Sequence, residues 1–290
     1  MLSQQQIQDF HEQGVLVVPN VVSAQELAGM TEDLAAWVEE SRGHAQAWGQ
    51  TQDGRARFDI ESDHSATHPS LRRISSPTEI SGHYFQVAMH SRMTEMAGEL
   101  IGGKGMRFHH SKLNAKLPHT ATQVKWHQDF PFTPHTNDDL VTALLMLTDV
   151  STENGPLMVI PGSHRGTLFS HWQQGRFTGQ VEEEVIAQYC GAPMSCTGRA
   201  GSVCFMHTRL LHASGPNTTT LPRNMFITVY KAEDAQALCE NPLPSQHENQ
   251  LVFGVESGLV RMTPNRLKLP QKPAGASFFV QQAGLDTAMM

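Results

Sequence analysis

The sequence of 290 residues predicts a mainly β protein with flanking helices, built around a sandwich or jelly-roll core. After Gly105 the chain consists of short β-prone runs separated by turn residues, which is typical of such cores. Before Gly105, apolar residues recur at helical spacing behind two helix-start signatures. We therefore expect one domain, with N-terminal helices over about 1–104, a jelly-roll core over about 105–235 and a C-terminal extension over about 236–290.

Capping boxes mark the first two helices. Ser3 with Gln6, and Ser23 with Glu26, place a hydroxyl and a reaching side chain three residues apart, as a helix N-terminus requires. The β-branched run between these helices predicts a strand. The elements expected in this half are that strand over 15–22, a long loop or lid over the polar stretch 42–70, and a third helix over about 84–101 that ends at two glycines.

The β-prone runs of the second half define the expected core. They lie at roughly 106–117, 122–127, 141–150, 156–161, 202–207, 210–214 and 223–231. A stretch from 165 to 197 interrupts them, and we expect it to be an insertion that crosses one edge of the barrel. Its run of three glutamates, 182–184, is expected to be a solvated face.

Composition argues against several classes of function. The net charge is -7 with both signs interspersed, which creates no field that attracts a nucleic acid or an anionic membrane. Four cysteines without C-x-x-C spacing do not form a secreted disulfide scaffold. The N-terminus lacks a signal-peptide pattern, and about 18 apolar residues never run together. We expect a cytoplasmic protein with reduced thiols, a small-molecule substrate and no nucleic-acid or membrane partner; the oligomeric state stays open.

A metal site is indicated by the segment VKWHQDF. His127 and Asp129 are two residues apart, so on a strand both side chains would point to the same face. A third ligand is expected in HTRLLHASGPN, where His212 is preferred and His207 is the alternative. Two imidazoles and one carboxylate on one side of Fe(II) leave positions open for O₂ and a bidentate co-substrate.

Three motifs in order resemble the phytanoyl-CoA dioxygenase family of Fe(II)- and 2-oxoglutarate-dependent oxygenases. They are WHQD, NGPLMVIPGSHRG, and LLHASGPN with Arg223 eleven residues after His212. The resemblance covers roughly residues 5–235. It implies a double-stranded β-helix with a cupin-like core, iron held by His127, Asp129 and His212, and 2-oxoglutarate and O₂ as co-substrates.

The resemblance also implies which side chains hold the co-substrate. Arg223 is expected to bind the distal carboxylate of 2-oxoglutarate, because its planar guanidinium matches a carboxylate in two parallel hydrogen bonds. Ser214 is expected to assist at that carboxylate. The remaining candidates are Asn114 and His164 for the co-substrate, and His110 and Lys116 for the substrate.

The expected reaction is hydroxylation of a small polar metabolite such as an amino acid, a zwitterion or an organophosphonate, with release of succinate and CO₂. A larger apolar natural product or an acyl-CoA is the alternative substrate. A metal-cupin hydrolase or isomerase, or a non-catalytic binding protein, is the alternative from another class. Basic residues upstream of His127 either form a cationic pocket for an anionic substrate or lie on the surface: Arg55, Arg57, Arg72, Arg73, Arg107 and His110.

Overall fold

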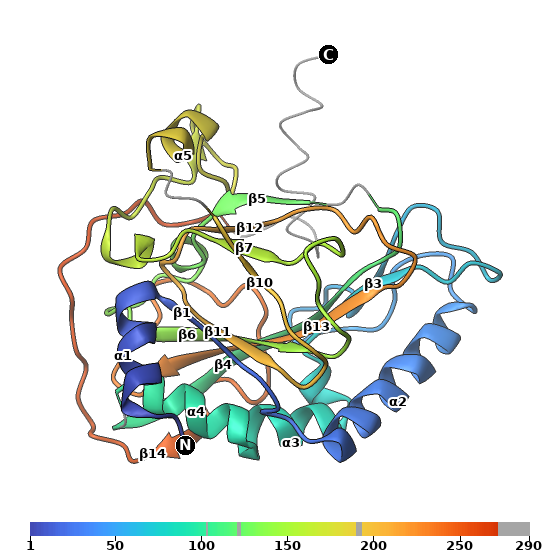
Figure 1. The fold of residues 1–290 in the computed structure, drawn as a ribbon, viewed down its shortest axis with the longest axis horizontal. Coiled ribbons are helices and arrows are strands. Elements are labelled where there is room, and N and C mark those ends of the chain that lie inside the picture. Colours follow the sequence, from blue (N-terminus) through green and yellow to red (C-terminus); the bar gives the residue numbers. More distant parts are fainter. Residues whose placement is uncertain (103, 121–122, 190–192, 272–290) are drawn as a thin grey trace.

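Two antiparallel sheets and a layer of helices make up the fold in the computed structural model, which describes residues 1–102, 104–120, 123–189 and 193–271. Figure 1 shows the layers in order, with the N-terminal helices below the large sheet and the smaller sheet above it. The helices are α1 (Gln4–Gln13), α2 (Ala24–Ser41), α3 (Gly82–His90), α4 (Arg92–Leu100) and α5 (Glu183–Tyr189). Short 3-10 turns are η1 (Pro77–Glu79), η2 (Phe130–Phe132) and η3 (Ser163–Arg165).

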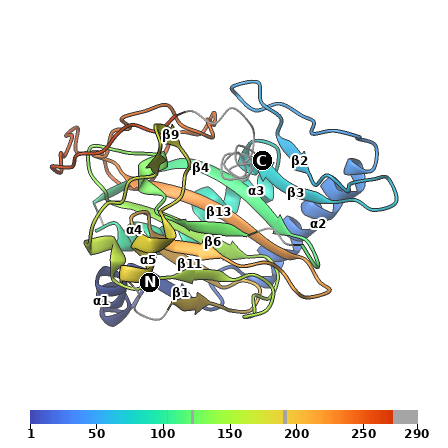
Figure 2. The same ribbon diagram turned by 90° about the horizontal axis from the view of Figure 1, so that it is seen from above.

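The large sheet has eight antiparallel strands, and Figure 2 shows them succeeding one another from β1 to β4. Their order is β1 (Val15–Val18), β11 (Val203–His207), β6 (Leu140–Met146), β13 (Arg223–Ala232), β4 (Gly105–Lys116), β3 (Leu71–Ser75) and β2 (Phe58–Ile60), with β14 (Leu251–Gly254) also paired to β4. The smaller sheet runs β10 (Met194–Cys196), β7 (Leu157–Val159), β12 (His212–Ser214) and β5 (Val124–His127). A separate hairpin joins β8 (Trp172–Gln173) to β9 (Arg176–Phe177). This arrangement confirms the mainly β, jelly-roll fold.

Each face of the large sheet has its own apolar core. On the helix side, Phe226 and Tyr230 of β13 are fully buried, and Phe226 packs edge-on against Tyr84 of α3. On the other side, Met225 and Ile227 of the same strand pack toward the smaller sheet. Because neighbouring residues of a strand point to opposite faces, β13 contributes to both cores. The space between the two sheets holds the site described below.

Both capping boxes are present, so the first two helices begin where the sequence predicts. The third predicted helix is wrong in one respect, because Ser91 adopts an extended conformation and caps α4, which divides the segment into α3 and α4. The predicted loop over 42–70 is largely irregular but contains β2. Four strands that were not predicted join the sheets: β2 and β3, β10 from the end of the expected insertion, and β14 from the expected C-terminal extension. Residues 272–290 of that extension lie outside the described residues.

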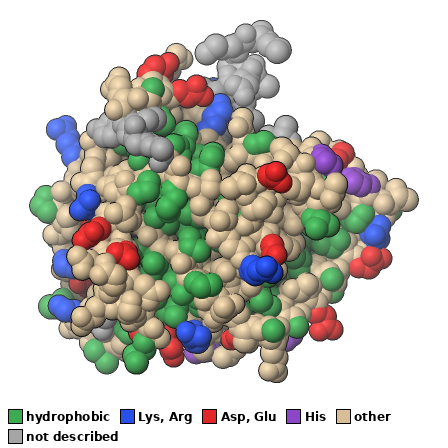
Figure 3. Space-filling view, in the orientation of Figure 1, with side chains coloured by type: hydrophobic (Ala, Val, Ile, Leu, Met, Phe, Trp, Pro, Cys, Tyr) green, Lys and Arg blue, Asp and Glu red, His purple; other side chains and the backbone are tan. Residues whose placement is uncertain are grey.

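The distribution of charged side chains and the free state of the described cysteines agree with the expectations. On the face drawn in Figure 3, acidic and basic side chains are interspersed. Glu182, Glu183 and Glu184 are exposed. Cys196, Cys204 and Cys239 are free thiols, and Cys190 lies outside the described residues. Within the described part of the chain, each helix is too short or too polar to cross a lipid bilayer.

Candidate active site

His127, Asp129 and His212 meet at one end of the space between the sheets. His127 of β5 and His212 of β12 are directly opposite each other in the antiparallel pair. The Nε2 atoms of the two rings lie 3.4 and 3.5 Å from the same Asp129 oxygen, Oδ1. One ligand atom from each residue falls within 4.8 Å of the others, so the three side chains could hold one metal ion. His207, the alternative third ligand, is not part of this group.

The backbone sets the tautomer of both imidazoles. His127 Nδ1 donates a hydrogen bond to the carbonyl oxygen of Lys125 at 2.8 Å, and His212 Nδ1 donates to that of Leu210 at 2.9 Å. Because each Nδ1 carries the proton, each Nε2 lone pair points toward the shared centre, as metal-ligating histidines require. Burial lowers the pKa of His127 to about 4, so this ring is neutral at pH 7.

Asp129 does not lie on the strand that the sequence suggests. β5 ends at His127, and Asp129 has helical backbone angles (φ -72°, ψ -34°) immediately before the turn η2. The prediction that the pair shares one face of a strand is therefore wrong, although both side chains do meet. Burial acts to raise the pKa of Asp129, but the neighbouring imidazoles hold it well below its usual value. The hydroxyl of Thr142 on β6 donates to Oδ2 at 3.3 Å and orients the carboxylate.

Gln128 fixes the bend between these two ligands. Its backbone N–H donates to Nε2 of His171 at 3.0 Å. Its fully buried side chain donates to the carbonyl oxygens of Thr167 and Arg209 and accepts from the N–H of Phe169. Residues of the expected insertion thus hold the turn that carries Asp129, a role that the sequence motif alone does not reveal.

A cavity of about 180 Å³ opens beside the triad, between the two sheets. Alternate residues of β4 line it, because every second side chain of a strand points to the same side. These residues are His110, Lys112, Asn114 and Lys116. Apolar side chains of the neighbouring strands β6 and β13, Leu144, Met225 and Ile227, line the same side of the cavity. All four polar side chains therefore face the same space as the triad.

Arg223 lies at one end of this cavity, directly opposite Lys116 in the β13–β4 pair. The residue is 95% buried, and its Nε has no hydrogen-bond partner among the described residues. Lys116 donates to the hydroxyl of Ser214 at 2.9 Å and to the carbonyl of Gly215. Burial lowers the pKa of Arg223 to about 10, and burial together with Arg223 lowers the pKa of Lys116 to about 7. A buried arginine without a partner is costly, so this end of the cavity is built for an anion.

The other candidate residues divide into two groups. Ser214, Asn114, His110 and Lys116 line the cavity, and the Asn114 side-chain oxygen is buried without a partner. His164 does not line the cavity: its Nε2 donates to the carbonyl of His11 at the end of α1, and its ring packs against His207. The expected contact of His164 with the co-substrate is therefore unsupported, and the residue joins η3 to the N-terminal helix.

The basic residues upstream of His127 were expected either to form a cationic pocket or to lie on the surface, and some of them line the cavity. Arg55, Arg72 and Arg73 line the cavity together with His110. Arg57 and Arg107 do not; they pair with Glu79 and Glu256 instead. Lys112 was absent from the predicted residues, although its position two residues before Asn114 on the same strand was the available signal.

Comparison with known proteins adds independent findings. The family model described as phytanoyl-CoA dioxygenase (PhyH) matches residues 10–225. The chain is 29% identical over 276 residues to the protein of Stutzerimonas stutzeri named "Probable alpha-ketoglutarate-dependent hypophosphite dioxygenase", and the match covers 93% of this chain and 92% of that protein. It is 28% identical to the ectoine dioxygenase of Halomonas elongata, over 80% of this chain and 71% of that one.

Solved structures agree with this result. The apoform of EctD from S. alaskensis superposes with a TM-score of 0.65 at 26% identity, covering 94% of this chain and 88% of EctD. The match to the family model spans most of the chain and includes the triad strands, the segment around His164 and Arg223. On this evidence, the chain belongs to the phytanoyl-CoA dioxygenase family.

Proposed function

We propose that this protein is an Fe(II)- and 2-oxoglutarate-dependent dioxygenase that hydroxylates a small polar metabolite and releases succinate and CO₂. The observation that carries the proposal is the presence, in one cavity, of a facial set of two histidines and one carboxylate together with the unpartnered guanidinium of Arg223. A metal site alone would fit a cupin hydrolase or isomerase equally well. The buried arginine adds a requirement for an anionic second ligand, which 2-oxoglutarate satisfies.

The donor set fits ferrous iron. Two imidazoles and one carboxylate on one side of the ion leave the remaining positions free. When bound, Fe(II) supplies the activation of O₂ that couples decarboxylation of 2-oxoglutarate to transfer of an oxygen atom to the substrate. His127, Asp129 and His212 would hold the ion, and Arg223 with Ser214 would bind the distal carboxylate. Apolar side chains around Leu144 and Ile227 would keep water from the reacting groups.

The cavity favours a small substrate. Pockets for drug-sized ligands enclose about 300–1,000 Å³, whereas this one encloses about 180 Å³ and must also admit the co-substrate. An acyl-CoA or a large apolar natural product would have to remain mostly outside it. The relatives named for hypophosphite and ectoine act on small polar compounds, which supports the same class of substrate here.

A succinate assay tests this proposal. Purified protein with Fe(II), 2-oxoglutarate and air is screened against small amino acids, zwitterions and phosphonates. We expect at least one compound to stimulate succinate release, and we expect Asp129→Ala to abolish that release. Glu182→Ala, an exposed carboxylate, is the control and should behave as wild type. Undiminished turnover in Asp129→Ala would contradict the proposed iron site, and wild-type protein that leaves 2-oxoglutarate intact with every compound would contradict the oxygenase proposal.

A further inference from the structure

Arg73 is a second buried arginine without a partner. It lies on β3 directly beside Asn114 of β4, and it lines the cavity that contains the triad. Its side chain is about 92% buried, and its Nε is fully enclosed without a hydrogen bond. The structure records no ion pair to this guanidinium from any described residue. A buried guanidinium that lacks a hydrogen-bond acceptor destabilises the folded protein unless a ligand supplies one.

Lys112 adds a second unpaired charge at the same end of the cavity. It lies on β4 two residues before Asn114, opposite Ser75 of β3. Among the described residues, its ammonium group has neither a hydrogen-bond acceptor nor an ion-pair partner. Burial and the nearby charge of Arg73 lower the pKa of Lys112 to about 8, whereas Asp129 acts in the opposite direction. Lys112 is therefore within electrostatic range of both Arg73 and the metal-binding carboxylate.

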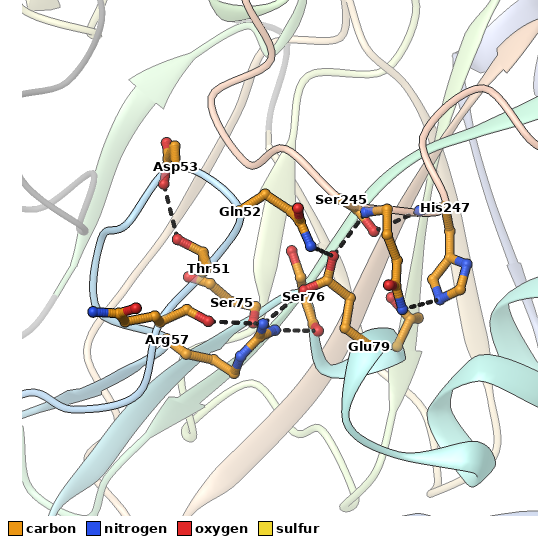
Figure 4. Close-up of polar contacts among 12 residues, drawn as sticks. Thr51, Gln52, Asp53, Arg57, Ser75, Ser76, Glu79, Ser245 and His247 are labelled. Atoms are coloured by element: carbon orange, nitrogen blue, oxygen red, sulfur yellow. Dashed lines mark hydrogen bonds and ion pairs between the residues drawn. The ribbon is translucent and has the colours of Figure 1, made fainter.

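The arginines near Arg73 in the sequence all form ion pairs, in contrast to Arg73. Arg55 pairs with Asp53 at 2.7 Å, and Arg72 pairs with Asp59 and Glu61 at 2.9 and 3.1 Å. Arg57 donates to Glu79 at 2.6 Å and to the carbonyls of Ser75 and Ser76, as Figure 4 shows. The segment 50–80 thus supplies a bonded carboxylate to three of its arginines. Arg73 has only the electrostatic attraction of Asp59, which lies opposite it in the β2–β3 pair and is bonded to Arg72.

The two cationic ends of the cavity are separate. Lys112 and Lys116 are four residues apart on β4, which is about 13 Å along an extended strand. The end at Lys116 and Arg223 suits the distal carboxylate of 2-oxoglutarate. Arg73 lies beside Asn114, between these two lysines along β4. An anion bound by Lys116 and Arg223 therefore leaves Lys112 without an acceptor.

We infer that Arg73 and Lys112 form the substrate site and bind an oxyanion group, such as a phosphonate, phosphinate or carboxylate, on the molecule that is oxidised. A planar guanidinium and a point-charge ammonium together offer several donors to the oxygen atoms of such a group. Binding of the anionic group there would position the rest of the substrate beside His127, Asp129 and His212. This inference deepens the proposed function and rests on it for the identity of the reaction.

Anion binding can be measured separately from turnover. The protein loaded with Fe(II) and 2-oxoglutarate under argon is titrated calorimetrically with methylphosphonate, with acetate and with the uncharged dimethyl ester of methylphosphonate. We expect one or both anions to bind and the ester not to bind. In Arg73→Met and Lys112→Met, we expect anion affinity to fall roughly 10- to 100-fold, the effect of losing one charge-assisted hydrogen bond. Methylphosphonate and acetate distinguish a tetrahedral from a planar head group.

Control variants separate a lost site from a damaged fold. Arg73→Lys and Lys112→Arg keep the charge and should retain most of the affinity, and Lys104→Met removes an exposed charge and should change nothing. The affinity for 2-oxoglutarate should be the same in all five variants. Equal binding of the ester and the anions, or wild-type anion affinity in both methionine variants, would overturn the inference. Anion binding by a protein that forms no succinate with any compound would support the anion site and contradict only the proposed oxygenase reaction.

Discussion

Each imidazole of the triad is held by a carbonyl two residues earlier in the chain. His127 and His212 share this arrangement with His135 and His171, whose Nδ1 atoms donate to the carbonyls of Thr133 and Phe169. The identity of the ligands could be predicted from the order and spacing of the motifs. Their protonation could not, because it depends on local backbone geometry that the spacing does not encode. A binding role for Lys112 and Arg73 was similarly difficult to predict, because a lysine or an arginine indicates a ligand site only when the structure shows that it has no bonded partner.

Arg223 should affect the co-substrate and leave the iron in place. Arg223→Gln removes the guanidinium but no metal ligand, so we expect the dissociation constant of 2-oxoglutarate to rise by roughly 10- to 100-fold or more. Calorimetry under argon with Fe(II) measures this change, and the iron content of the variant should equal that of wild type. Arg199→Gln, at an exposed position, is the matched control. Equal loss of iron and of 2-oxoglutarate would argue against the assigned role.

Acid should destabilise the metal-free protein through its buried histidines. Burial lowers the pKa of five of them to about 3 or 4: His110, His127, His135, His171 and His207. An unfolded chain titrates its histidines near pH 6.5 and so binds more protons than the folded chain below that pH. The contribution of each buried neutral ring to the free energy of unfolding is therefore fully present above pH 6.5. It falls by about 1.4 kcal/mol per pH unit as pH drops toward 4.

Urea unfolding at pH 7.5, 6.0 and 5.0 measures this slope. We expect the slope to be smaller in His207→Gln, which removes one buried ring that lies outside the triad. Replacement of His68, whose side chain is 70% exposed, should leave the slope as it is in wild type. A free energy of unfolding that stays constant from pH 7.5 to 5.0 would contradict the neutral, buried state of these rings.

The bend from β5 into η2 is the element on which the triad depends. Its strand and its metal ligands could be predicted, but the change of backbone direction between them could not be read from alternation alone. Pro131, inside η2, was the available signal that the strand stops early. The helix break at Ser91 was missed for the same reason, because apolar periodicity continues across it. Both capping boxes were predicted correctly, since a cap depends only on residues three positions apart.

Gln128 should stabilise both the fold and the iron site. Gln128→Ala removes three hydrogen bonds to backbone groups of Thr167, Phe169 and Arg209 and leaves a void in place of a fully buried side chain, so we expect a loss of about 2 to 4 kcal/mol in the free energy of unfolding. The turn that carries Asp129 should also loosen and weaken Fe(II) binding. Chemical denaturation and iron titration measure the two effects, with Gln25→Ala on the exposed face of α2 as the control. An unchanged iron affinity would show that the turn holds its shape without this side chain.

In the whole molecule, an acidic chain encloses a cationic cavity. The net charge is -7, yet six lysine and arginine side chains line the cavity against two carboxylates, Glu61 and Asp129. Composition could therefore predict the absence of an exposed basic field but not the charge of the interior. The jelly roll brings His127 and His212 opposite each other although 84 positions separate them in the sequence, and this pairing made the site predictable once strand order was inferred. β2 and β3 were not predicted, because their short segments become strands only by pairing with each other and, for β3, with β4.

Isotope labelling tests the proposed reaction most directly. A dioxygenase that uses 2-oxoglutarate places one atom of O₂ in succinate and the other in the hydroxylated product. With ¹⁸O₂ and the compound that best stimulates turnover, we expect mass spectrometry to find one ¹⁸O atom in succinate, and we expect His212→Ala to form no labelled succinate. Succinate that forms without label, or labelled succinate formed equally by His212→Ala, would contradict the assignment of this cavity as an iron and 2-oxoglutarate centre.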